Sequence, residues 1–169
     1  WLVPGSKQVE ALWVLQHLVD SGRTSEWSEL DRRVQEGPSS IDASTQDLFF
    51  HHQGPVSNAM AHAVSTSSAD LVIFAPYLFW PTIALAPTVI EKAVIVPAAH
   101  DEPFLRLSRV RDVLQNSRGL IYGSRAEQRL LQTTHPIAHL PGTVLGWGIE
   151  EAESSNSEIR TELRLDDRP

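Results

Sequence analysis

The sequence has no cysteine among its 169 residues. Disulfide bridges, thiolate metal sites and cysteine nucleophiles are therefore excluded, and a reducing compartment suits such a chain. Long apolar runs are also missing, because none reaches the roughly 18 residues that a membrane-spanning helix requires. The first ten residues lack the basic start, apolar stretch and cleavage site of a signal peptide. These absences favour a cytoplasmic protein and leave open a peripheral contact with a membrane surface.

Positive charge is the second shortage. The 14 Lys and Arg residues are outnumbered by 21 Asp and Glu residues, which gives a net charge of -7. A nucleic-acid-binding protein that works through a broad basic face is therefore not expected, although a small cationic pocket for a phosphate stays compatible with the sequence. Hydrophobic residues make up 41% and charged residues 21% of the chain, which is ordinary for a globular protein. The length suits one α/β domain with a real core.

The front of the chain, residues 1–68, reads as a mostly helical portion of that domain. Apolar residues recur at helical spacing over 9–19, and Thr24 or Ser25 is a candidate cap for a second helix. The expected helices cover residues 9–19, 24 or 25 to 34, 47–52, and 57 or 58 to 64. The only candidate strand in this portion is residues 1–3.

The middle of the chain, residues 69–149, has a different pattern. Four short apolar runs occupy residues 70–75, 93–98, 119–122 and 143–146, and the segments 81–90, 105–116 and 125–133 between them are long enough for helices. Continuous apolar runs are typical of strands that are buried on both faces. Alternation of strand and helix predicts a Rossmann-like, three-layer α/β domain with a mostly parallel sheet. Residues 150–169 are acidic and Ser-rich, which indicates a linker with one short helix over 157–165.

Candidate site residues follow the apolar runs, because ligands of open parallel sheets bind beyond the carboxyl ends of the strands. His100, Asp101 and Glu102 form the densest polar group. A histidine in this place can act as a general base, a hydrogen-bond donor or a metal ligand. The alternative is that His100 and Asp101 only cap the next helix. A metal site is not expected, because no second histidine or acidic pair lies nearby at ligand spacing.

Two other strand ends carry candidates. Tyr77 and Trp80 could stack on a sugar face, or their rings could simply pack against the next helix. Ser124 and Glu127 form an S-x-x-E pattern, which on local grounds is a capping box. A helix N-terminus can also attract a phosphate, but the carboxylate of Glu127 argues against an anion there.

In this order, the strand ends resemble those of the first domain of family 4 glycosyltransferases, which retain anomeric configuration and have the GT-B fold. The resemblance rests on the segments DLVIFAPYLFWPT (70–82), AVIVPAAHDEP (93–103), GLIYGSRAE (119–127) and VLGWGIE (144–150), with a looser likeness over 158–169. It covers roughly residues 50–169.

The resemblance implies a partial GT-B protein: an acceptor-binding domain whose partner domain, beyond residue 169, would hold the nucleotide-sugar donor. His100 would approach the reacting sugar or acceptor, and Asp101 and Glu102 would orient it. Tyr77 and Trp80 would line the acceptor side, and Ser124 and Glu127 would match the family's S-x-x-E. No cofactor and no obligatory metal are implied, and the chain alone is expected to be inactive.

Two alternatives from other classes stay open. One is a non-catalytic α/β binding or interaction module that has kept the fold. The other is a small independent Rossmann-type enzyme that uses His100 as its base, which requires a complete sheet and a closed pocket within these residues.

Overall fold

The computed structural model describes residues 25–146 and residue 148. Three expected elements, the strand at 1–3, the helix over 9–19 and the segment 150–169, lie outside the described residues. The linker and domain boundaries placed near residue 150 therefore stay predictions.

Helices dominate the first part of the described chain, as the sequence predicted. The elements are α2 (Ser25–Glu36), the 3-10 turn η1 (Pro38–Ser40), α3 (Ala43–Gln53) and α4 (Asn58–Ser65). Side-chain caps set two of the starts: Asp42 accepts the backbone N–H of Thr45 at 2.9 Å and begins α3. Ser57 accepts the backbone N–H of Met60 at 3.2 Å and begins α4. Such caps satisfy amides that have no partner within the helix.

Strands and helices alternate through the second part. The elements are β1 (Val72–Phe74), η2 (Pro81–Leu85), η3 (Ala86–Lys92), β2 (Ala93–Ile95), η4 (Pro103–Arg106), α5 (Ser108–Asn116), β3 (Gly119–Tyr122), α6 (Arg125–Thr134) and β4 (Gly142–Val144). The four strands form one parallel sheet in the order β1-β2-β3-β4. The predicted α/β class with a parallel sheet is confirmed.

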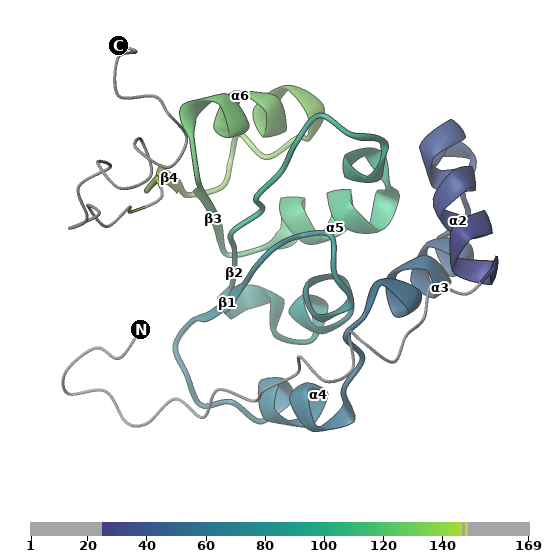
Figure 1. The fold of residues 1–169 in the computed structure, drawn as a ribbon. Coiled ribbons are helices and arrows are strands. Elements are labelled where there is room, and N and C mark those ends of the chain that lie inside the picture. Colours follow the sequence, from purple (N-terminus) through teal and green to yellow (C-terminus); the bar gives the residue numbers. More distant parts are fainter. Residues whose placement is uncertain (1–24, 147, 149–169) are drawn as a thin grey trace, which may run out of the picture.

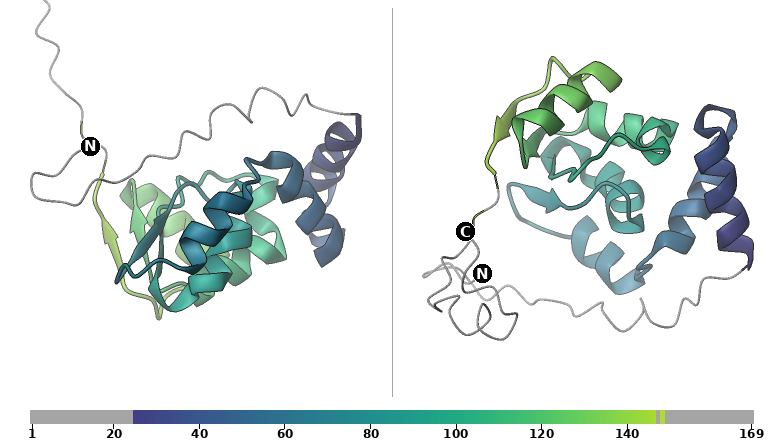
Figure 2. Two further views of the ribbon diagram at one scale, coloured as in Figure 1. Left: turned by 90° about the horizontal axis from the view of Figure 1, so that it is seen from below. Right: turned by 45° about the horizontal axis from the view of Figure 1, so that its top comes forward.

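The connecting helices lie on one face of the sheet (Figures 1 and 2). Phe74, Ile95 and Leu120 stand in register across β1, β2 and β3, and all three are buried. On the opposite face Ile73 is 62% exposed and its register partner Val94 is only half-buried. Within residues 25–146 the structure therefore has two layers, whereas the sequence predicted three. Because strand order follows chain order, crossovers of the same hand place their helices on the same side.

Two predicted crossover helices differ from the structure in form. The expected helix over 81–90 is a π-helical turn, η2, followed by the 3-10 segment η3, with a kink at Val89. Pro87 has no N–H to donate to the preceding turn, so a continuous α-helix cannot run from η2 into η3. The expected helix over 105–116 is divided into η4 and α5 at Leu107, whose backbone is extended.

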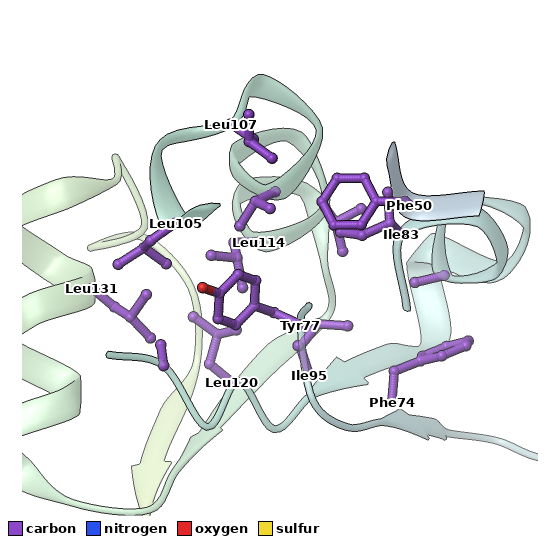
Figure 3. Close-up of a cluster of buried hydrophobic side chains, with 14 of the residues drawn as sticks. Phe50, Phe74, Tyr77, Ile83, Ile95, Leu105, Leu107, Leu114, Leu120 and Leu131 are labelled. Carbon is purple, nitrogen blue, oxygen red and sulfur yellow. The ribbon is translucent and has the colours of Figure 1, made fainter. Parts of the chain in front are cut away.

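The core lies between the sheet and the helices, and it is shown in Figure 3. The ring of Tyr77, with its hydroxyl oxygen, sits among apolar side chains from η4, α5 and β3 that include Leu105, Leu114 and Leu120. Tyr77 is 1% exposed. A residue that follows β1 in the sequence is thus part of the core beneath the strand ends.

Candidate functional site

A pocket of about 360 Å³ lies where the carboxyl ends of β2 and β3 meet the start of α6. It is lined by Ala98, Ala99, His100, Asp101, Gly123, Ser124, Ala126, Glu127 and Leu130. Four of the seven side chains that the sequence singled out are in this lining: His100, Asp101, Ser124 and Glu127. The position agrees with the general rule that ligands of parallel sheets bind beyond the carboxyl edge.

Glu127 ties the two strand-end loops together. Its Oε1 accepts the backbone N–H of Ala99 at 2.7 Å, and its Oε2 accepts the backbone N–H of Gly123 at 2.6 Å. The residue is only 8% exposed, so both bonds are shielded from water. An ionised carboxylate is a strong acceptor, and such charge-assisted bonds are stronger than neutral ones. Glu127 therefore fixes the wall of the pocket.

Ser124 behaves as the capping-box pattern predicted. Its Oγ accepts the backbone N–H of Glu127 at 3.1 Å and begins α6. The other half of the pattern differs, because Glu127 reaches Gly123 and Ala99 and not the amide of Ser124. The Ser124 side chain is exposed at the pocket, and its hydrogen bond with the backbone N–H of Glu127 holds it at the start of the helix.

The backbone at the end of β2 is held in an unusual conformation. Ala98 has φ 53°, in the left-handed region that a residue with a Cβ atom adopts at a cost of roughly 1–2 kcal/mol. The next amide, that of Ala99, is the one that Glu127 binds. A conformation of this kind persists only where surrounding contacts impose it, and such residues gather at functional sites.

His100 follows this turn and is exposed on the pocket wall. Its neighbour Asp101 is also exposed and forms a salt bridge of 2.6 Å with Arg106. Arg106 donates a second hydrogen bond, at 2.9 Å, to the backbone carbonyl of Glu102. The loop that presents the imidazole is therefore closed by a guanidinium bridge. An imidazole so placed can accept a proton from, or donate a hydrogen bond to, a hydroxyl in the pocket.

Tyr77 and Glu102 meet below this loop. The Tyr77 hydroxyl donates a hydrogen bond of 2.5 Å to Glu102 Oε1. Burial, together with the hydrogen bond to Glu102, raises the pKa of Tyr77, so the hydroxyl stays protonated and keeps donating. Because the ring is buried in the core, the expectation that Tyr77 lines an acceptor at the surface is corrected: it contacts Glu102 instead.

Trp80 does not join the pocket either. Its half-buried ring packs against the core, and its backbone N–H donates to the carbonyl of Gly54 at 3.1 Å. Of the packing and stacking alternatives for Trp80, the structure favours packing. Within the described part of the chain, Tyr77, Trp80 and Glu102 are outside the lining of the pocket. Trp147, which directly follows the fourth apolar run (143–146), lies outside the described residues.

The sequence reasoning missed Ala98 and Ala99. Both are small apolar residues: Ala98 ends the run 93–98 that was predicted as strand, and Ala99 follows it. The strand itself ends earlier, at Ile95. No local pattern predicts a left-handed alanine or an amide bound by a side chain 28 residues away. The only signal was the position of these residues directly before His100.

Two further properties concern the whole described region. No group of three or more His, Asp or Glu side chains within residues 25–146 and 148 is placed to hold a metal ion. In the same region, every helix is too short or too polar to cross a lipid bilayer.

Comparison with known proteins finds no match among protein-family models, curated proteins or solved structures.

Proposed function

We propose that this chain is the acceptor-side domain of a retaining glycosyltransferase, which transfers a sugar from a nucleotide-sugar to a hydroxyl group of an acceptor. One observation carries the proposal: His100, Asp101, Ser124 and Glu127, taken from two separate strand ends, line a single pocket at the carboxyl edge of a parallel sheet. Two of the four segments that resemble family 4 glycosyltransferases, residues 93–103 and 119–127, supply all of this lining except Leu130.

The pocket offers the groups that hold and activate a hydroxyl. The His100 imidazole would accept the proton of the acceptor hydroxyl. The acceptor oxygen would bond to the anomeric carbon on the face from which the nucleoside diphosphate leaves with the electron pair of the broken bond, so that the configuration is retained. Asp101 and the Ser124 hydroxyl would hydrogen-bond neighbouring hydroxyl groups. The donor would be held by a second domain facing this edge, and no cofactor takes part.

Rigidity supports the same function. Catalytic groups must be held close to their productive geometry, and supporting hydrogen bonds provide this. Glu127 fixes the amides of Ala99 and Gly123, and Arg106 clamps Asp101 to the carbonyl of Glu102. The loop that carries His100 is thus braced from both sides.

The competing function is a non-catalytic binding module that uses the same pocket. It predicts that a ligand binds while no transfer depends on His100. A third reading, an independent small enzyme, predicts turnover by these residues without a second domain.

The test is His100→Gln in the full-length protein that carries this sequence, assayed by release of nucleoside diphosphate from a panel of nucleotide-sugars with hydroxyl acceptors. Loss of a general base typically lowers the rate by about 10²–10⁴-fold, so we expect a loss of at least about 100-fold. His139→Gln is the matched control, because His139 is exposed and lies outside the pocket lining.

Both variants should keep the thermal midpoint of the unchanged protein, since both histidines are exposed. Equal transfer by the His100→Gln variant and the unchanged protein would end the catalytic role of His100. Transfer by residues 1–169 alone would favour the independent enzyme.

A further inference from the structure

The pocket holds two features of opposite electrostatic sign. The first is the N-terminus of α6, where the amides of Arg125 and Ala126 have no acceptor within the helix. A helix N-terminus carries the equivalent of about half a positive charge and commonly binds phosphate. Taken alone, this feature would make the pocket an anion site.

The second feature is a pair of carboxylates in the lining. Glu127 cannot swing away, because its two oxygens are bound by the amides of Ala99 and Gly123. Asp101 adds a second negative charge, which Arg106 partly offsets through their 2.6 Å salt bridge. Among the described residues that line the pocket, no lysine or arginine is present. The negative charges of Glu127 and of Asp101, the latter partly offset by Arg106, thus oppose the roughly half positive charge of the helix N-terminus.

We infer that this pocket selects a neutral, hydroxyl-rich part of the substrate and discriminates against phosphate and other anions. The inference rests on the proposed function in taking the pocket as the place where the acceptor binds. A sugar hydroxyl can donate to the Asp101 carboxylate and accept from an amide of the first turn of α6, whereas phosphate oxygens chiefly accept. A phosphorylated acceptor would have to carry its phosphate outside this pocket.

The experiment follows backbone amide signals of Gly123, Ser124 and Ala126 by NMR during titration with inorganic phosphate at constant ionic strength. A pH of about 8 keeps free imidazole groups neutral. The unchanged chain is compared with Asp101→Asn, which removes one carboxylate from the exposed side of the pocket. Asp70→Asn is the control, because Asp70 is also exposed, the substitution changes the net charge equally, and the residue lies outside the lining.

We expect Asp101→Asn to bind phosphate about tenfold more tightly than the unchanged chain, and Asp70→Asn to bind it no more tightly. Glu127→Gln should change affinity in the same direction, but it also weakens the loops, so Asp101→Asn remains informative if Glu127→Gln does not fold. Equal phosphate affinity in the unchanged chain and Asp101→Asn would show that the Asp101 carboxylate does not exclude the anion, and it would overturn the inference. The same conclusion would follow if neither protein bound phosphate.

The transfer assay with His100→Gln separates this inference from the proposed function. If Asp101→Asn leaves the phosphate affinity unchanged while His100→Gln still abolishes transfer, the selectivity is refuted and the proposed function stands. If Asp101→Asn raises the phosphate affinity while His100→Gln leaves transfer unchanged, the selectivity stands and the proposed catalytic role of His100 is refuted.

Discussion

The side chain of Gln46, in α3, caps the N-terminus of α5 by accepting the backbone N–H of Arg109 at 2.9 Å. The same oxygen accepts the Ser108 hydroxyl at 3.1 Å, and the Gln46 Nε2 donates to the carbonyl of Ile41 at 2.8 Å. The next residue, Asp47, forms a salt bridge with the Arg109 guanidinium. Gln46 and Arg109, 63 positions apart in the sequence, thereby join α3 to α5. Helix α5 acquires a cap that its own N-cap residue, Leu107, cannot supply.

Gln46→Met tests this cap. Gln46 is 2% exposed, so its loss leaves the Arg109 amide and the Ile41 carbonyl without partners in a site that water reaches poorly. We expect the free energy of unfolding to fall by about 1–3 kcal/mol, measured by urea denaturation. Gln35→Met is the control, because Gln35 is exposed on α2 and its side chain donates to the exposed neighbour Asp31 at 2.6 Å. A Gln46→Met loss no greater than that of Gln35→Met would contradict the prediction.

A second prediction concerns the support of the His100 loop from below. Tyr77→Phe removes the hydroxyl that donates to Glu102 Oε1. Hydrogen bonds to charged groups contribute about 1.5–3 kcal/mol, and Glu102 is only half-buried, so water should replace part of this and the expected loss is about 1 kcal/mol. The more specific result is faster amide hydrogen exchange at residues 99–102.

Tyr122→Phe is the matched control for Tyr77→Phe. It removes the hydroxyl of the other tyrosine of the sequence, which is buried on β3 at 2% exposure, and it leaves the bond to Glu102 intact. Exchange at residues 99–102 should then stay as in the unchanged chain. Equally slow exchange in both variants would show that the Tyr77 hydroxyl does not support the loop and that the ring contributes packing alone.

Much of the fold followed from local patterns, because strands and caps are short-range features. The strand over Gly119–Tyr122 was predicted with its observed limits, and Ser124 was predicted as a cap because its partner amide is three residues away. The broken crossover helix was missed although Pro87 carries the signal, since a proline inside a helical pattern removes a donor. Here the sequence held the signal, but the helix was predicted from the length of the segment between two strands.

The site followed only in part, because its remaining determinants join distant segments. Position after a strand brought His100 and Ser124 to one pocket, but it gave the wrong surroundings for Tyr77. The backbone N–H of Tyr77 donates to the carbonyl of Pro97 at 3.1 Å, and its ring lies in the core. That contact spans two strand ends, as does the bond from Ala99 to Glu127. Neither is encoded in a window of neighbouring residues.

The exposed face of the sheet shows the same limit. Leu71, Ile73 and Leu145 are 53%, 62% and 76% exposed, although their runs predicted strands buried on both sides. An apolar run indicates that a strand can be buried on both faces, but the crossovers decide which face a helix covers.

His135 directly follows α6 and is 6% exposed. Neither ring nitrogen has a hydrogen-bond partner within the described residues. Burial lowers the pKa of His135, and the charges of Arg111 and Arg106 lower it further, while the nearby Leu105 carbonyl acts in the opposite direction and is outweighed. The folded protein therefore holds this ring neutral.

The sign of the pH effect follows from that lowered pKa. Above the ordinary value of 6.5 the ring is neutral in both states and stability is unaffected. As the pH falls below 6.5, the unfolded chain binds a proton that the folded protein does not, so the free energy of unfolding decreases until the pH reaches the lowered folded-state pKa. His135→Leu fills a similar volume, removes the titration and should remove this part of the loss. Urea denaturation at about pH 7.5 and about pH 5.5 measures it, with His139→Leu as the exposed control. Between the two pH values the unchanged chain and His139→Leu should lose more stability than His135→Leu, and equal losses in all three proteins would show that His135 is protonated as readily in the fold as outside it.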